Sequence, residues 1–148
     1  MYDTLTALQD MPIAVSTNKA KSQHYELPTS FFRLVLGKNL KYRMRLGITG
    51  FIVAKNYRSS RVTGICNSIT QKAYIEEKCQ DLQLQNLDII VADISTFEME
   101  ASYDRIYSIG MFEHMKNYKD LLKKISRWMK EDGLLFVHHF CHNICLPL

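Results

Sequence analysis

No apolar run in this sequence approaches the roughly 20 residues that a membrane-spanning helix needs. The first residues, MYDTLTALQDMP, lack the basic start and the apolar block of a secretory signal peptide. Internal repeats and low-complexity segments are missing as well. The chain is long enough for one domain, and its 47% of apolar residues predicts a packed core rather than disorder. We therefore expect a soluble protein of the cytoplasm, with no membrane partner.

The four cysteines form no paired framework of the kind that holds small secreted domains together. Cys66 and Cys79 fall inside segments that we expect to pack into the core, and the other two are Cys141 and Cys145. Free thiols in a reducing compartment are therefore the expectation.

Acidic residues are absent from Gly37 to Arg61, although the same stretch holds seven lysines and arginines. The rest of the chain carries 12 basic and 15 acidic residues, so the net charge of +4 comes from this one stretch. Interleaved aromatic residues would suit nucleic-acid binding. No nucleic-acid fold signature accompanies the charges, and we therefore favour a solvated loop and helix face without a nucleic-acid partner.

Apolar and β-branched runs alternate with helical patterns from residue 61 onward. The sequence predicts strands at 61–66, 87–93, 103–109 and 134–140, and helices at 69–84 and 117–130. Residues 1–42 are predicted to form a mainly helical arm, with a short helix at 28–37. Strand, helix, strand, strand, helix and strand in this order predict an α/β protein with a parallel sheet and right-handed crossovers.

Local signals set the bounds of the two helices. Ser68 and Gln71 form a capping box for the first, and Asn117 caps the second, which Gly133 is predicted to end. The predicted buried face of the first helix consists of Ile69, Ala73, Cys79 and Leu82. That of the second consists of Leu121, Leu122, Ile125, Trp128 and Met129.

An acid and a base stand side by side in YDRIYSIGMFEHMKNY, residues 103–118. Glu113 and His114 come just after a predicted strand, as do Asn67, Asp93 and Gly110 after theirs. Ligands of parallel α/β sheets bind beyond the carboxyl ends of the strands. Position alone leaves two interpretations open, a proton-transfer pair or a surface acid beside a packed histidine.

Two blocks of the sequence, residues 2–42 and residues 62–142, resemble the plant (S)-coclaurine N-methyltransferases. These belong to the cyclopropane-fatty-acid-synthase-like group of S-adenosylmethionine-dependent methyltransferases. The resemblance implies an N-terminal helical arm, residues 1–42, and a partial methyltransferase domain, residues 43–148, with an incomplete Rossmann-like class I sheet. It implies S-adenosylmethionine as cofactor. It also implies methyl transfer to the ring nitrogen of a benzylisoquinoline alkaloid precursor, a small-molecule amine.

The family motifs assign residues that contact the cofactor. The resemblance implies that Asp93 and Ile94 contact the adenine, and that Asn67 and Gln71 face the ribose. Tyr42 matches a tyrosine of the arm that approaches the cofactor. Polar residues in these loops suit the ribose hydroxyls that nucleotide-binding sheets recognise.

The same resemblance assigns the catalytic pair, because Glu113 and His114 match the last two residues of the family's E-M-F-E-H motif. Gly110 departs from the family, which has a carboxylate at this position. We therefore expect weaker binding of the amine, since one anion of the cluster is missing.

Two further departures concern whole segments. The family has a strand ending in V-L-D-V-G-C-G-W-G-S, whereas MRLGITGFIVAKNY, residues 44–57, retains only a remnant G-x-x-G. The family also continues past residues 140–142. We expect an internal deletion and an early stop, loose packing unless 45–54 serves as a strand, and weak or no activity. The alternative is a non-catalytic remnant that forms a homo-oligomer or associates with a full-length relative.

Three histidines and two cysteines lie within HHFCHNIC, residues 138–145, and could ligate zinc. Their spacing fits no standard zinc pattern, and the resemblance accounts for all but His139 and Cys145 without a metal. We therefore expect no metal site.

Overall fold

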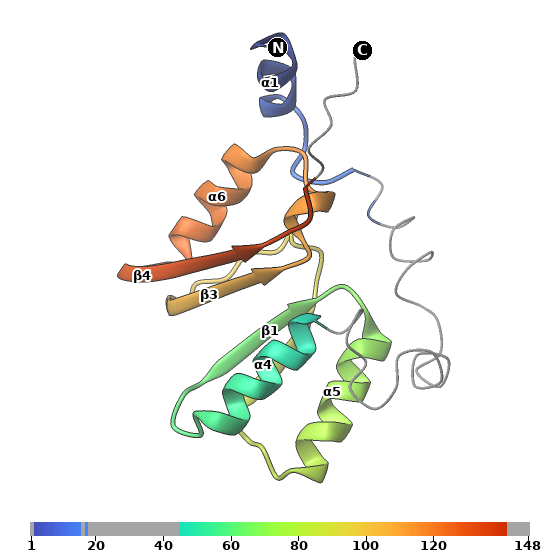
Figure 1. Ribbon diagram of the computed structural model, residues 1–148, viewed down its shortest axis with the longest axis vertical. Coiled ribbons are helices and arrows are strands. Elements are labelled where there is room, and N and C mark those ends of the chain that lie inside the picture. Colours follow the sequence, from blue (N-terminus) through green and yellow to red (C-terminus); the bar gives the residue numbers. More distant parts are fainter. Residues whose placement is uncertain (1, 16, 18–44, 142–148) are drawn as a thin grey trace. The chain divides into compact units, whose positions relative to one another are not determined.

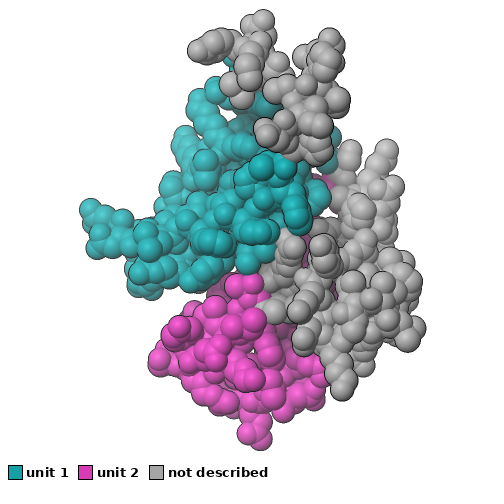
Figure 2. All heavy atoms as spheres, viewed as in Figure 1, with its two compact units in different colours: residues 1–15, 99–148 teal, residues 16–98 magenta. Residues whose placement is uncertain are grey.

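A computed structural model describes residues 2–15, 17 and 45–141 of the chain (Figure 1). The chain divides into two compact units, residues 1–15 with 99–148 and residues 16–98 (Figure 2). Each unit holds one two-stranded parallel sheet. The α/β class and the parallel pairing predicted from the sequence are therefore confirmed, although the described strands form two sheets rather than the one that was predicted.

The unit of residues 16–98 contains α4 (Arg45–Asn56), β1 (Val62–Cys66), α5 (Ile69–Asp81) and β2 (Leu87–Val91). The ladder between β1 and β2 runs in register from Val62 opposite Leu87 to Cys66 opposite Val91. The hydroxyl of Ser68 accepts a hydrogen bond from the backbone N–H of Gln71 at 3.3 Å, which confirms Ser68 as the predicted helix cap.

The core of this unit lies between the sheet and the two helices and is formed by Ala54, Cys66, Ile75, Cys79, Leu84 and Ile89. Ile75 and Cys79 are the buried residues of α5, four positions apart on one helix face. The predicted buried face was right for Cys79 and wrong for Ile69, Ala73 and Leu82, which are exposed. The difference arises because α5 packs against β2 and α4 at the Ile75–Cys79 stripe.

Residues 45–54 do not replace the family's missing strand, because they lie within the helix α4. Gly47 and Gly50 of the remnant G-x-x-G are therefore helical positions. Ala54 of the same helix is fully buried, so α4 serves the core of its unit rather than a sheet.

The unit of residues 1–15 and 99–148 contains α1 (Tyr2–Gln9), β3 (Tyr103–Ile109), η1 (Phe112–His114), α6 (Tyr118–Arg127) and β4 (Met129–His138). The ladder between β3 and β4 is in regular register from Arg105 opposite Leu134 to Ile109 opposite His138. Of the predicted helical arm, α1 is described, whereas residues 28–37 and Tyr42 lie outside the described residues. The division at residues 42 and 43 stays a prediction.

Helix α6 begins where the sequence predicted, with Asn117 accepting a hydrogen bond from the backbone N–H of Asp120 at 3.0 Å. Leu121, Ile125 and Trp128 are buried, as predicted. Leu122 was predicted to be buried as well, but it is 43% exposed. It lies one residue beyond the buried stripe, on the solvent side of the helix.

The predicted end of this helix was wrong. Helix α6 stops at Arg127, and β4 starts at Met129, opposite Tyr103. Gly133 lies inside β4, where the register with β3 shifts. A Cβ atom there would lie 2.9 Å from the carbonyl oxygen of Lys130 and 3.2 Å from that of Tyr103. Glycine is therefore needed for a close backbone approach in an irregular strand, not for a helix stop.

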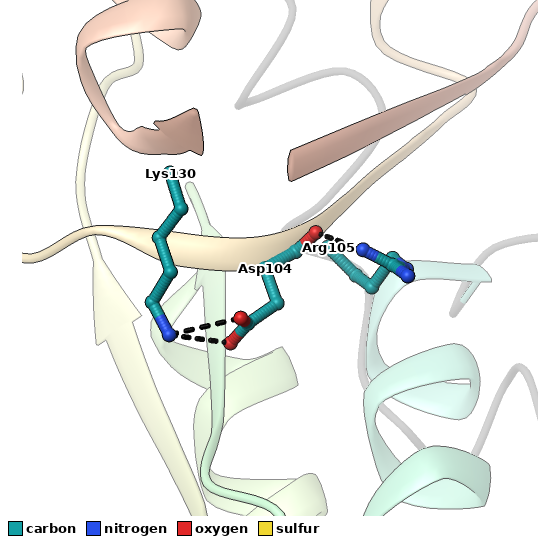
Figure 3. A network of polar contacts seen from close by, with 3 residues as sticks. All are labelled: Asp104, Arg105 and Lys130. Carbon is teal, nitrogen blue, oxygen red and sulfur yellow. Dashed lines mark hydrogen bonds and ion pairs between the residues drawn. The ribbon is translucent and has the colours of Figure 1, made fainter. Parts of the chain in front are cut away.

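An ion pair lies beside this irregularity (Figure 3). Lys130 Nζ donates to both carboxylate oxygens of Asp104 at 2.9 Å, and Arg105 Nη1 donates to the Asp104 carbonyl at 2.7 Å. The hydrogen bond from Lys130 lowers the pKa of the Asp104 carboxyl below its ordinary 3.8. The ion pair therefore stabilises the folded chain at pH values above the ordinary pKa of the carboxyl. This stabilisation is lost as the pH falls through the lower pKa of Asp104 in the folded chain.

We expect Leu121→Ala to destabilise its unit by about 2–5 kcal/mol, because Leu121 is fully buried and the substitution leaves a cavity. Its neighbour offers a matched control, since Leu122→Ala should cost less than about 0.5 kcal/mol at an exposed site. Hydrogen exchange of the α6 amides measures the loss of stability in both variants. Equal exchange rates in the two variants would contradict the packing described here.

Candidate functional site

The residues predicted to face the nucleoside part of the cofactor follow two neighbouring strands. Asn67 comes directly after β1, Gln71 lies in the first turn of α5, and Asp93 and Ile94 come just after β2. The backbone N–H of Ala92 donates to the Cys66 carbonyl at 2.8 Å, so both strands end at the same level. The structure therefore brings these four half-buried residues to one edge of the β1–β2 sheet.

Asp93 organises the turn after β2. Its Oδ1 accepts hydrogen bonds from Ser95 Oγ at 2.6 Å and from the Ser95 backbone N–H at 2.9 Å. The Asp93 carbonyl accepts from the backbone N–H groups of Thr96 and Phe97. Asp93 thus fixes the loop that carries Ile94, and a bound nucleoside would share its carboxylate with these local bonds.

The predicted catalytic pair lies after β3 in the other unit. Gly110 follows the strand with φ at +66°, a backbone conformation that favours glycine, and its N–H donates to the His138 carbonyl at 2.8 Å. Residues 112–114 then form the short helix η1, which places Glu113 and His114 beyond the carboxyl end of β3. His114 is exposed and Glu113 is half-buried.

One carboxylate oxygen of Glu113 is buried without a hydrogen bond. Glu113 Oε2 has no partner within the described part of the chain. A buried polar atom left unpaired costs about 1–3 kcal/mol, and such atoms are often found where a ligand or a proton is handled. The other oxygen, Oε1, would lie 3.5 Å from a Cβ atom placed on Gly110. The missing side chain of Gly110 therefore leaves room directly beside the carboxylate.

Sequence reasoning missed what holds this loop in place. Asn117 was predicted only as a helix cap, but its amide also donates to backbone carbonyls of Gln9 and Met11. No local pattern signals these bonds, because their partners lie more than 100 residues away along the chain. The only hint in the sequence was an asparagine where serine or aspartate would cap a helix equally well.

The described cysteine and histidines at the end of β4, Cys141, His138 and His139, belong to no metal cluster. No group of three or more possible ligands gathers among residues 2–15, 17 and 45–141. His142 and Cys145 lie outside the described residues. Cys66, Cys79 and Cys141 are free, as predicted, and burial raises the pKa of the Cys66 and Cys79 thiols above the ordinary 9.0.

Known methyltransferases are similar to this chain. A family of methyltransferase domains matches residues 46–137. The (S)-coclaurine N-methyltransferase of Papaver somniferum is 34% identical over 181 residues, covering 97% of this chain and 52% of the relative. The pavine N-methyltransferase of Thalictrum flavum subsp. glaucum is 35% identical over 176 residues, covering 93% of this chain and 49% of the relative.

A solved structure of an N-methyltransferase is also similar to this chain. A crystal structure of coclaurine N-methyltransferase bound to N-methylheliamine and SAH superimposes with a TM-score of 0.85 at 36% identity, covering 95% of this chain and 52% of that chain. The incomplete class I methyltransferase fold predicted from the resemblance is thereby confirmed.

The matches cover this chain almost completely but only part of each relative. The chain spans about half the length of the curated relatives it matches. The alignment with the poppy relative extends over 181 positions, more than the 148 residues of this chain, so part of the relative has no counterpart here. The described part of the chain has no helix that is long and apolar enough to cross a membrane. With its fold, its matched residues and its relatives in agreement, the chain belongs to the methyltransferase domain family.

Proposed function

We propose that this chain derives from an S-adenosylmethionine-dependent N-methyltransferase that acts on a secondary amine of the benzylisoquinoline class. The observation that carries the proposal is the buried Oε2 of Glu113, which has no hydrogen-bond partner among the described residues and lies next to His114 beyond the carboxyl end of β3 in a methyltransferase fold. The similarity to alkaloid N-methyltransferases supports the class of amine.

The chemistry of the acceptor explains why an acid and a base are needed. A secondary aliphatic amine resembles lysine, with a pKa of about 10.4, and is therefore mostly protonated near neutral pH. Glu113 would bind the ammonium through the oxygen that has no partner. The imidazole of His114 would take the proton, which frees the nitrogen lone pair. S-adenosylmethionine supplies the methyl group to that lone pair when it is bound.

The residues of the chain fit only part of this cofactor. Asn67, Gln71, Asp93 and Ile94 offer polar and apolar contacts for the nucleoside at one sheet edge. The remnant glycines, Gly47 and Gly50, lie within a helix and form no loop that could wrap the methionine end. We therefore propose that binding is weak and rests mainly on the nucleoside contacts, with a further contribution from Tyr42.

We expect S-adenosylmethionine to bind with a dissociation constant in the high-micromolar to millimolar range, about −4 to −6 kcal/mol. Gln71→Ala should weaken binding roughly two- to tenfold, the loss of one hydrogen bond. Gln80→Ala, on an exposed position of the same helix, is the matched control. Ligand-observed NMR and calorimetry measure these values. Low-micromolar binding by the unmodified chain would contradict the loss of the methionine cradle.

A cytoplasmic location and an association with a full-length relative belong to the same proposal. The free thiols of Cys66, Cys79 and Cys141 support a reducing compartment. The exposed apolar side chains of Tyr107, Leu134 and Phe136 on β3 and β4 would suit contact with another protein chain.

A further inference from the structure

Asn117 is one of the largest fully buried side chains of the described residues, with 2% of its surface exposed. Its Oδ1 accepts from the backbone N–H of Asp120 at 3.0 Å. Its two Nδ2 hydrogens are shared among three acceptors, the carbonyl oxygens of Gln9 at 2.8 Å and Met11 at 2.9 Å and Asp120 Oδ2 at 2.8 Å. One side chain therefore joins the start of α6 to the last residue of α1 and to the backbone that follows it.

The backbone makes a second connection to the same segment. The N–H of Lys116 donates to the Ile13 carbonyl at 2.8 Å, and Met115 forms an antiparallel bridge with Ala14. In Figure 1 the blue segment after α1 passes beside the orange turn that holds η1. Residues 9–15, called the N-terminal strap here, thus run along residues 115–117.

The turn with Glu113 and His114 is held on its other side by Phe112. The Phe112 side chain is 6% exposed, and its ring lies 5.7 Å from that of Tyr118. The hydroxyl of Tyr118 donates to the Phe112 carbonyl at 2.9 Å. The two catalytic candidates therefore lie between two anchored points, the Phe112–Tyr118 contact and the bonds of residues 115–117 to the strap.

We propose that Asn117 is a positioning residue for Glu113 and His114, and that the N-terminal strap is the platform on which it holds them. This inference rests on the proposed function for its catalytic meaning. A helix cap needs only an acceptor, which serine or aspartate provides equally well. Binding the strap carbonyls needs an N–H donor as well, and asparagine supplies both. The Asn117 amide uses its N–H groups for the strap as well as its oxygen for the cap.

The substitution Asn117→Asp separates the two roles. Aspartate keeps the capping acceptor but turns an oxygen toward the Gln9 and Met11 carbonyls, so the strap bonds are lost. The same oxygen would face Asp120 Oδ2, so Asn117→Ser, which brings no second carboxylate, distinguishes loss of the donor from that repulsion. Asn117→Ser also keeps a cap and has no group that reaches the strap. Asp120→Ala is the matched control, because it removes a contact of Asn117 on α6 and leaves the strap bonds intact.

The test is NMR of the full 148-residue chain. In Asn117→Asp we expect protected α6 amides, at least tenfold faster exchange of the Lys116 amide, and shifted or broadened His114 ring signals. The shifts that 1,2,3,4-tetrahydroisoquinoline, a secondary amine, induces at His114 should weaken as well. Asp120→Ala should leave the Lys116 and His114 readouts close to those of the unmodified chain.

Unchanged Lys116 exchange and unchanged His114 signals in Asn117→Asp would overturn the inference. If that variant does not fold, the Lys116 exchange and the His114 ring signals are measured in Asn117→Ser, and the same outcomes support or overturn the inference. Absence of any amine-induced shift in the unmodified chain would count against the proposed function instead. The effect of Asn117 on the turn would still be decided by the exchange and ring signals, so the two failures are distinguishable.

Discussion

Replacing His114 by alanine is expected to lower N-methylation by about 10²–10⁴-fold in a chain that holds the methyl donor, because the proposed general base is lost. Such a chain is a chimera, with the family's glycine-rich strand restored after Tyr42 and the family's C-terminal part appended. The deficit should be smaller as the pH approaches the pKa of the amine, since less substrate then needs a base. The pH–rate profile of the chimera measures both effects.

His139→Ala is the matched control, because this exposed histidine two residues from Cys141 has no counterpart among the family motifs. In the unmodified 148-residue chain neither substitution should matter, since we expect the methyl donor to be weakly held. An unchanged pH–rate profile in the His114→Ala chimera would show that His114 is a surface histidine without a role in proton transfer.

The carboxylates of the same chimera should act on binding rather than on proton transfer. Glu113→Gln should weaken binding of the amine by removing the anion. Gly110→Glu should raise the rate by one or more orders of magnitude, since a charge-assisted hydrogen bond contributes roughly 1.5–3 kcal/mol. The φ of +66° makes any side chain there cost about 1–3 kcal/mol of folding stability, so Gly110→Ala is needed as control for strain. Equal rates for the alanine and glutamate variants would exclude the missing-carboxylate explanation.

The unmodified chain is expected to unfold over a broad temperature range, and restoring the family's strand should give one sharp transition. Two-stranded sheets are only marginally stable by themselves, and net folding stability of a domain is about 5–15 kcal/mol. Here the buried apolar residues are divided between two units, each with one strand pair.

Differential scanning calorimetry distinguishes the two chains, and a Gly/Ser insert of equal length after Tyr42 is the control. The control should unfold as broadly as the unmodified chain, because it adds length without a core-filling strand. One sharp, cooperative transition in the unmodified chain would overturn the expectation that the lost strand leaves it loosely packed.

Local interactions explain which features were predictable from the sequence. Ser68 and Asn117 start helices because their side chains accept backbone N–H groups three residues ahead, a bond that depends on nearby residues alone. The strands at β1, β2 and β3 were readable from short apolar runs between these caps. Their order also placed Asn67, Asp93 and Gly110 at the carboxyl ends, since parallel pairing follows from the intervening helices.

Contacts between distant segments decided the rest. The sequence could not reveal that Gly133 lies in a strand, because the reason is its approach to the carbonyl of Tyr103, thirty residues earlier. It showed Glu113 beside His114, but burial of one carboxylate oxygen depends on how the whole loop packs. It marked Asn117 as a cap, while the bonds to Gln9 and Met11 exist only once the N-terminal strap has folded against the loop. The sequence by itself thus determined most of the elements and the position of the candidate site beyond the strand ends. Only the tertiary structure decided how the catalytic candidates are held there, because the bonds that hold them join segments far apart in the chain.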